Sequence, residues 1–286
     1  MKAVIDIGSN SVRLLVFDGE ADFKQGVSDL EITRLGQGLD RTGRLSPEGI
    51  RATWEVLDRF QQTIEQTGVD EVEAFATEAV RTAADGADFI EQLRRRYGWK
   101  ARIISGEEEA LIGFVGATSA LAEGEWTLID IGGASTEIIQ GRDAIDYRQS
   151  FPIGALRYTE RPETDLAKVF QDLPPLFGQI VGIGGTITTI MAMELALTSY
   201  RRDRIQGAKL TKACLEKWVN RLQAMTPQAR RQLPGLDPKR EPIILGGMKL
   251  LHYLLERFDQ EWLVVSDYGN LEGYAISRGL CRTNSI

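Results

Sequence analysis

Two short stretches of the sequence place an aspartate directly before a turn of glycine and serine residues. VIDIGSNS covers residues 4–11 and LIDIGGAS covers residues 128–135. In a strand-turn-strand hairpin, small turn residues let backbone N–H groups converge on an anion, and a carboxylate at the strand end can hold a divalent cation beside it. One copy alone is equally consistent with a tight turn that needs glycine. Two matched copies, built around Asp6 and Asp130, favour a duplicated phosphate and metal site.

A third glycine turn, GIGGT at residues 182–186, leads from an expected strand into an expected helix. The N-terminus of a helix is a natural place for a phosphate or a nucleotide. Many α/β proteins need a glycine-rich turn at such a place, so this motif by itself is weak.

The stretch ISGEEEALIGFVG carries three consecutive glutamates that differ in their expected surroundings. Ser105 can cap a helix that begins here, and Glu108 lies three residues later as a capping-box partner. At helical spacing Glu108 shares a face with apolar residues, whereas Glu109 lies in line with Gly113 and Gly116. A bare glycine face permits close approach of another backbone or of a ligand, so Glu109 has the open side.

The composition excludes several classes of site. His252 is the single histidine of the chain, so a histidine-rich metal site is impossible and a Ser-His-Asp triad would have to use this residue. Cys214 and Cys281 lie far apart without metal-ligand spacing, which indicates two thiols in a reducing compartment. The formal net charge of −7 argues against a nucleic-acid partner, because contacts to a phosphate backbone rely on an excess of Lys and Arg.

The length of 286 residues is one at which a single core usually gives way to two. No apolar run reaches the roughly 18 residues expected of a membrane-spanning helix. The N-terminus MKAVIDIG meets Asp6 before the apolar core of a signal peptide could form. We therefore expect a cytoplasmic protein with two domains and no membrane partner.

Strands and helices must alternate to position these motifs, as in a layered α/β domain. In the first half, the pattern predicts strands at 2–7, 12–18, 30–35, 72–77 and 101–104, and helices at 46–68, 88–97 and 106–119. In the second half, it predicts strands at 126–131, 135–140, 144–150, 180–183 and 262–265, and helices at 164–172, 186–196, 211–225, 241–257 and 271–278. The loop at 122–125 is the expected boundary between the halves.

The order of seven motifs resembles the exopolyphosphatase/guanosine pentaphosphate phosphatase (Ppx/GppA) family. The motifs are DIGSNSVRLLVFD, ATEAVR, SGEEEA, DIGGAST, FPIGALR, GIGGT and VVSDYGNLEG, and they extend from Asp6 to Gly273. The resemblance implies an α/β fold of two ribonuclease-H-like domains, of the actin-like ATPase superfamily, that flank an interdomain cleft. We expect these domains at residues 1–122 and 123–286, with the two hairpins as counterparts that clamp phosphates from both sides.

The same resemblance implies roles for individual residues. Glu109 is expected as the catalytic base, and Arg81 of ATEAVR as the guanidinium that opposes charge in the transition state, for which arginine suits two phosphate oxygens at once. Asp6, Asp130 and Glu137 are expected to hold Mg²⁺. The expected phosphate contacts are Ser9, Asn10, Ser11, Arg13, Gly132, Gly133, Ala134, Ser135, Thr136, Gly184, Gly185 and Thr186. Ala134 and Leu271 depart from the glycine and arginine usual in the family, which affects substrate contacts more than the fold.

The expected reaction is release of the terminal phosphate of inorganic polyphosphate, or of the 5′-γ-phosphate of guanosine pentaphosphate, by attack of water. A kinase or ATPase of the same superfamily, and a non-catalytic sensor of polyphosphate or guanosine alarmones, are the alternatives. Longer relatives append a C-terminal domain of a His-Asp metal type, which we expect to be missing here, with a preference for short polyphosphates as the consequence. The resemblance also suggests a homodimer.

Overall fold

The computed structural model describes residues 1–19, 23, 26–133, 135–142 and 144–281. Contacts between Cα atoms divide the chain into two compact units. Unit 1 comprises Met1–Gly116 together with the segment that begins at Gly269, and unit 2 comprises Ala117–Tyr268. The expected boundary after residue 122 assigned the C-terminal helix to the second domain, whereas in the structure this helix belongs to unit 1.

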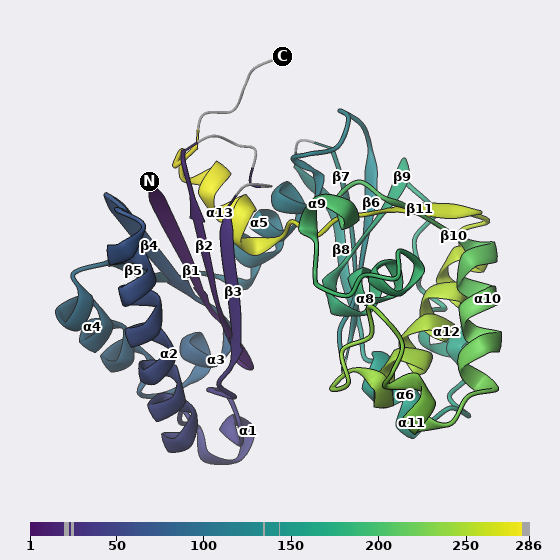
Figure 1. Cartoon of the computed structure of the whole chain (residues 1–286), viewed down its shortest axis with the longest axis horizontal. Coiled ribbons are helices and arrows are strands. Elements are labelled where there is room, and N and C mark those ends of the chain that lie inside the picture. The colour runs from purple at the N-terminus through teal and green to yellow at the C-terminus, as the bar shows by residue number, and fades with distance from the viewer. Residues whose placement is uncertain (20–22, 24–25, 134, 143, 282–286) are drawn as a thin grey trace. The chain divides into compact units, whose positions relative to one another are not determined.

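Unit 1 contains a mixed sheet with helices on its faces (Figure 1). In the described part of this unit, five strands lie in the order β3-β2-β1-β4-β5. β1, β2 and β3 form an antiparallel meander, while β4 and β5 run parallel to β1. The elements are β1 (Lys2–Ile7), β2 (Ser11–Phe17), β3 (Val27–Ile32), α1 (Leu39–Thr42), α2 (Pro47–Gln66), β4 (Glu71–Ala76), α3 (Glu78–Thr82), α4 (Gly86–Tyr97), β5 (Lys100–Ile103), α5 (Gly106–Thr118) and α13 (Asn270–Ser277).

The alternation of side chains along β1 separates a structural face from a chemical face. Ala3, Ile5 and Ile7 point into a core that also contains side chains of α2 and α4. Asp6 therefore points to the opposite face, which α13 covers through contacts with β1 and β2. On that face Tyr274 of α13 stacks on Phe75, with ring centroids 4.5 Å apart.

Unit 2 is built on a second mixed sheet. Among its described residues, six strands lie in the order β10-β11-β9-β6-β7-β8. The elements are β6 (Trp126–Ile131), β7 (Thr136–Gly141), β8 (Ile145–Phe151), α6 (Ala155–Glu160), α7 (Leu166–Val169), β9 (Gln179–Ile183), α8 (Gly184–Glu194), α9 (Arg202–Ile205), β10 (Lys209–Thr211), α10 (Lys212–Gln223), α11 (Pro227–Arg230), α12 (Glu241–Arg257) and β11 (Trp262–Val265).

The predicted duplication is confirmed strand by strand. The order β8-β7-β6-β9-β11 in unit 2 repeats the order β3-β2-β1-β4-β5 in unit 1, with the same parallel and antiparallel pairings. The same bond closes both hairpin turns. Gly8 N–H donates to the Ser11 carbonyl, and Gly132 N–H donates to the Ser135 carbonyl, at 2.9 Å in each case. The two sequence motifs thus occupy equivalent positions in equivalent sheets.

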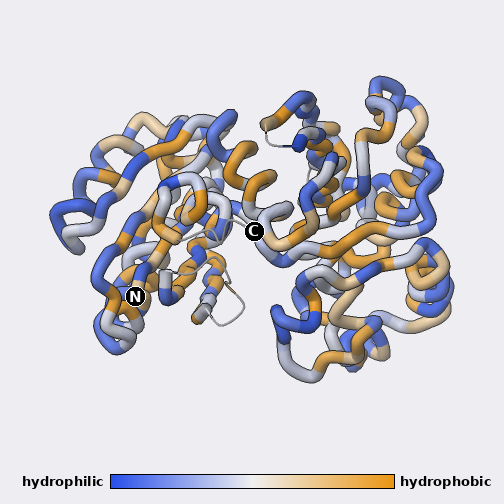
Figure 2. The backbone as a smooth tube through the Cα atoms, turned by 90° about the horizontal axis from the view of Figure 1, so that it is seen from above, coloured by the Kyte–Doolittle hydropathy of each residue, from blue (hydrophilic) through white to orange (hydrophobic). Residues whose placement is uncertain are grey.

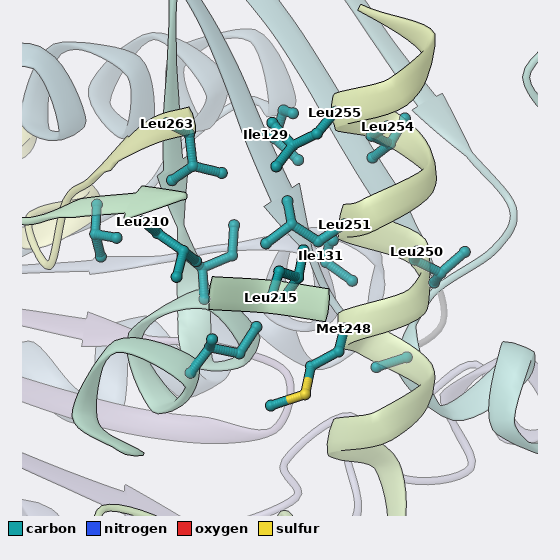
Figure 3. Close-up of a cluster of buried hydrophobic side chains, with 14 of the residues drawn as sticks. Ile129, Ile131, Leu210, Leu215, Met248, Leu250, Leu251, Leu254, Leu255 and Leu263 are labelled. Carbon is teal, nitrogen blue, oxygen red and sulfur yellow. The ribbon is translucent and has the colours of Figure 1, made fainter. Parts of the chain in front are cut away.

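α12 supplies much of the core of unit 2. Leu251 and Leu255 reach toward Ile129 and Ile131 of β6 (Figure 3). Several helices alternate between hydrophilic and hydrophobic along their length, as expected of elements with one buried face (Figure 2). In the described part of the chain, no helix has the length and the apolar character needed to span a membrane.

The structure departs from the expected elements where they are short. The expected helix at 164–172 is only the single turn Leu166–Val169, and the expected strand at 30–35 begins earlier, at Val27. Several helices of four to six residues were not predicted, because one turn shows no apolar periodicity. These are α1, α3, α6, α9 and α11.

Two glycines allow α5 and α13 to touch through their backbones. A Cβ atom on Gly116 would lie 1.9 Å from the carbonyl oxygen of Gly269, and one on Gly273 would lie 1.7 Å from that of Ile112. Since real Cβ atoms do not approach other atoms so closely, only glycine fits at these places. The glycine face predicted on α5 is therefore filled by another backbone, and this contact fixes the helix that carries Glu109.

The α5–α13 contact predicts opposite effects for two glycines on one helix face. Gly116→Ala should lower the free energy of unfolding by about 1 to 3 kcal/mol, because the new methyl meets immovable backbone. Gly113→Ala should be neutral or raise it by up to about 1 kcal/mol, because alanine favours helix and the new methyl meets only the Asn270 side chain, at 2.9 Å. Urea denaturation of both variants measures the difference, and equal effects would contradict the proposed backbone contact.

Candidate active site

Asp6 is a buried carboxylate at the end of β1. Its exposed fraction is 6%, and it lies directly opposite Arg13 in the register of β1 and β2. Burial raises the pKa of Asp6 to about 6, with Arg13 opposing the shift and the nearby Glu109 and Glu272 adding to it. Its Oδ1 atom is buried without a hydrogen-bond partner among the described residues. A buried acceptor oxygen without a partner suits a bound cation.

The three consecutive glutamates of α5 separate as their helical spacing predicts. Glu107 is exposed, and Glu108 forms two bonds of 2.6 and 2.8 Å with the guanidinium of Arg102. Glu109 instead lies beside Arg81, with Oε2 3.5 Å from Nη1. The structure therefore brings together the two residues expected to be the base and the transition-state arginine.

Arg81 is oriented by the backbone that precedes α5. Its Nη1 atom donates to the carbonyl of Ile104 at 2.7 Å, and a Cβ on Gly106 would lie 3.7 Å from its Nη2 atom. Its side chain remains 32% exposed and that of Glu109 remains 30% exposed. Both groups can thus meet a ligand while one of them is held in place.

The first turn is braced from behind by the segment after β3. The carbonyl of Asn10 accepts the N–H groups of Thr33 and Arg34 at 3.0 Å, and the carbonyl of Ser9 accepts that of Gly36 at 2.8 Å. These bonds fix the shape of the turn. The side chains expected to bind phosphate remain accessible, since Ser9 and Ser11 are partly exposed, and Asn10 and Arg13 are exposed.

Unit 2 carries a pair of carboxylates where unit 1 pairs Asp6 with an arginine. Asp130 and Glu137 lie directly opposite each other in the register of β6 and β7, and Ser150 Oγ donates to Glu137 Oε1 at 2.8 Å. Like charges at directly opposed positions destabilise a sheet. A divalent cation would relieve that repulsion, so this pair fits a metal.

The second turn is held by the helix that follows β8. The carbonyl of Gly132 accepts the N–H of Ala155 at 2.8 Å, and the carbonyl of Gly133 accepts that of Leu156 at 2.9 Å. Gly154 makes this approach possible, because a Cβ there would lie 2.5 Å from the Gly132 oxygen. The FPIGALR motif thus shapes the turn around Asp130.

Three of the expected phosphate contacts on unit 2 already donate a hydrogen bond within the protein. Thr136 is fully buried and donates its hydroxyl proton to the Ile153 carbonyl at 2.6 Å, and Thr186 donates its own to the Ile131 carbonyl at 3.0 Å. A hydroxyl has one proton, so neither can donate to a phosphate while these bonds hold. The N–H of Gly132 closes the turn. These residues brace the site, and Ala134 lies outside the described residues.

Gly184 and Gly185 begin α8 next to charged groups. Gly184 has a φ of 82°, which favours glycine, and a Cβ on it would lie 2.3 Å from Oδ1 of Asp130. A Cβ on Gly185 would lie 2.0 Å from Nη2 of Arg240. The GIGGT turn is therefore in contact with both an expected metal ligand and an arginine that the sequence did not single out.

Glu272 is a second residue that the sequence analysis missed. It is 2% exposed, and its Oε2 atom accepts the N–H of Gly269 at 2.8 Å at the start of α13. Its capping role could have been predicted from the sequence, because it stands at the third position of a helix that begins after a glycine. Its proximity to Asp6 depends on the packing of α13 on β1, which one sequence does not reveal.

The three carboxylates expected to bind a metal are divided between the two units. Within the described ranges, no three His, Cys, Asp or Glu side chains are grouped in a way that could hold a metal ion. Unit 1 offers Asp6, and unit 2 offers Asp130 and Glu137. So few protein ligands suit a hard cation, such as Mg²⁺, that keeps several waters and also binds substrate phosphates. They do not suit a cation whose ligands all come from the protein.

Comparison with known proteins agrees with the motifs. The profile of the Ppx/GppA phosphatase family matches residues 18–280. Exopolyphosphatase 2 of Mycobacterium tuberculosis is 32% identical, over 96% of this chain and 97% of its own. The crystal structure of the Aquifex aeolicus member of the Ppx/GppA family superposes with a TM-score of 0.81 at 32% identity, covering 98% of this chain and 97% of that one. The two-domain α/β fold is thus the actin-like fold of these proteins.

Two further relatives are longer than this chain. A bifunctional 3-dehydroquinate synthase/phosphatase of Fusobacterium nucleatum is 31% identical over 98% of this chain, which spans 46% of that protein. A guanosine-5′-triphosphate,3′-diphosphate pyrophosphatase of Pseudoalteromonas translucida is 29% identical over 96% of this chain, which spans 58% of that protein.

Because Asp6 is buried, we expect its charged form to lower the free energy of unfolding. With divalent cations chelated at pH 8, Asp6→Asn should raise the free energy of unfolding by about 3 kcal/mol, since a shift of roughly two pKa units corresponds to that penalty. The native carboxyl protonates near pH 6 and the unfolded one near 3.8. The difference should therefore shrink as the pH falls below 6 and disappear below about 4.

Urea denaturation across this pH range measures the effect. Asp146→Asn is the matched control, because Asp146 is exposed and its replacement should change stability by less than about 0.5 kcal/mol. An Asp6→Asn variant no more stable than wild type at pH 8 would show that burying this charge carries no penalty.

Proposed function

Because the chain belongs to the Ppx/GppA phosphatase family, we propose that it hydrolyses the terminal phosphoanhydride bond of inorganic polyphosphate or the 5′-γ-phosphate of guanosine pentaphosphate. The observation that carries this proposal is the convergence of Glu109, Arg81 and the buried Asp6 within unit 1. Positioned charges of this kind are what phosphoryl transfer requires of a protein, because the reaction depends on orientation and electrostatics more than on covalent chemistry.

In the proposed reaction, water attacks the terminal phosphorus and Glu109 accepts the proton that the water loses. The bond from that phosphorus to the bridging oxygen breaks, and the shortened chain leaves with the electron pair. Arg81 has several N–H groups besides the one that faces Ile104, and these oppose the charge that develops on the phosphoryl oxygens. Glu109 lies within reach of this guanidinium before substrate binds.

The proposal assigns Mg²⁺ to Asp6, Asp130 and Glu137, partly through water. When bound, this cation neutralises charge on the phosphate chain. Ser9, Asn10, Ser11 and Arg13 bind phosphoryl oxygens from unit 1. Backbone groups of Gly133, Ser135, Gly184 and Gly185 do so from unit 2, with Gly132, Thr136 and Thr186 as braces. Each half-site follows a strand end, where α/β sheets commonly bind their ligands.

Two attributes of the whole protein also belong to the proposal. We expect a homodimer, as the family resemblance suggests, and a location in the cytoplasm, as the N-terminal sequence and the lack of a long apolar run indicate. Light scattering coupled to size-exclusion chromatography measures the first, and a mass of one chain, 31.8 kDa, would contradict it.

The proposed function predicts phosphate release from linear polyphosphate with Mg²⁺ and without any acceptor molecule. Polyphosphates of defined length and guanosine pentaphosphate should be compared side by side in a phosphate-release assay. Hydrolysis of at least one of them, stopped by EDTA, is the expected result. Transfer to an acceptor from ATP, with no release from either substrate, would instead identify a kinase.

The assignment of Glu109 predicts that Glu109→Gln lowers kcat by about a hundredfold or more, the range that positioned general bases supply, with a smaller effect on KM. Glu107→Gln is the matched control, because Glu107 is the exposed neighbour on the same turn and its replacement should leave kcat within about twofold. Equal kcat values for the two variants would remove Glu109 from the role of base.

A further inference from the structure

The guanidinium of Arg240 lies directly on the backbone of Gly185. A Cβ added to Gly185 would be 2.0 Å from Nη2, 2.1 Å from Nη1 and 2.2 Å from Cζ of Arg240. All three short distances are to guanidinium atoms, so the flat group covers the glycine. The residue that makes this contact is separated from it by more than fifty positions in the chain, in the turn before α12.

The two neighbouring glycines of the GIGGT turn are glycine for different reasons. Gly184 adopts a φ of 82°, which side chains rarely tolerate, and it touches the Asp130 carboxylate. Gly185 is not among the residues with positive φ, and the three atoms nearest to a Cβ there all belong to the Arg240 guanidinium. The missing side chain at Gly185 therefore makes room for a cation beside the expected phosphate site.

The buried acid next to Arg240 is paired with two other arginines. Glu241 is 3% exposed, and its carboxylate pairs with Arg230 and Arg231 at 3.4 Å each. The guanidinium of Arg240 lies at the start of α8. There, backbone N–H groups and the positive end of the helix dipole already favour an anion. A second positive group at this place strengthens the same preference.

We propose that Arg240 is a phosphate-binding residue of unit 2, seated on Gly185 so that the edge of its guanidinium meets phosphoryl oxygens of the polyphosphate chain next to Asp130. This inference rests on the proposed function and adds a ligand to its substrate site. A guanidinium that rests on the backbone through its face presents N–H groups in its plane, the geometry that holds two phosphate oxygens at once.

Two variants remove this group from its seat in independent ways. Arg240→Gln deletes the charge, whereas Gly185→Ala keeps the arginine and displaces it by a methyl group. The displacement should cost little stability, because the atoms in the way are the end of a flexible side chain. Each variant should raise KM for tripolyphosphate by about tenfold to a hundredfold, as expected for loss of a charge-assisted hydrogen-bonded pair, with a smaller change in kcat.

The double variant provides the sharpest readout. If both changes act through one guanidinium, Arg240→Gln with Gly185→Ala should be no weaker than Arg240→Gln alone. Isothermal titration with imidodiphosphate, a pyrophosphate analogue with a bridging nitrogen, measures the same losses without turnover. Additive losses, or wild-type affinity in Arg240→Gln, overturn the proposal.

Two control variants separate this role from general effects. Lys239→Gln removes the same charge from an exposed neighbour, and Gly124→Ala adds a methyl whose nearest contact is 3.8 Å away; both should bind imidodiphosphate like wild type. A wild type that binds imidodiphosphate in an Arg240-dependent manner but releases no phosphate contradicts the proposed hydrolysis alone. If Arg240→Gln hydrolyses polyphosphate as well as wild type does, the role of Arg240 alone is contradicted. If the wild-type protein does not bind imidodiphosphate, that role is contradicted as well.

Discussion

Holding the carboxylate of Asp6 out of water is the constraint on which the chemistry of unit 1 depends. β1 places it on the face of the sheet that α13 covers, and the surrounding acids Glu109 and Glu272 add negative charge. A fold selected only for stability would not bury an acceptor oxygen without a partner. A bound cation would explain the arrangement. The buried negative charge of Asp6 lowers the stability of the protein alone, but the same charge strengthens the binding of the cation.

Glycine residues allow helices and side chains to pack closely around the two hairpin turns. Gly116 and Gly273 bring α13 against the helix of Glu109, and Gly154 brings α6 against the second turn. Gly185 admits the guanidinium of Arg240 to the start of α8. In each case a side chain would separate two parts that the site needs together. The duplicated hairpins supply the aspartates, and these glycine contacts are among the features that differ between the two half-sites.

Local patterns in the sequence were sufficient for the parts that depend on neighbours in the chain. The hairpins, the long helix of residues 241–257 and the separation of Glu108 from Glu109 all follow from spacing along one element. The position of Arg240 on Gly185 and the proximity of Glu272 to Asp6 could not be found in this way, because both arise from packing between distant segments. The hydroxyl of Thr136 was assigned to phosphate by its position in a motif, whereas its burial commits it to Ile153. The helix after Gly269 was expected in the second domain from its place in the chain, whereas its packing against β1 and β2 groups it with unit 1.

The central proposal is that Asp6 and Asp130, which belong to equivalent hairpins of the two units, both serve as ligands of one cation that binds with the phosphate chain. Binding of Mn²⁺, as a paramagnetic substitute for Mg²⁺, can be measured by electron paramagnetic resonance in the presence of imidodiphosphate. The account predicts one tightly bound Mn²⁺ per chain, which both Asp6→Asn and Asp130→Asn weaken by about tenfold or more, the usual effect of losing a carboxylate ligand or its supporting partner. Unchanged binding in either variant would contradict it.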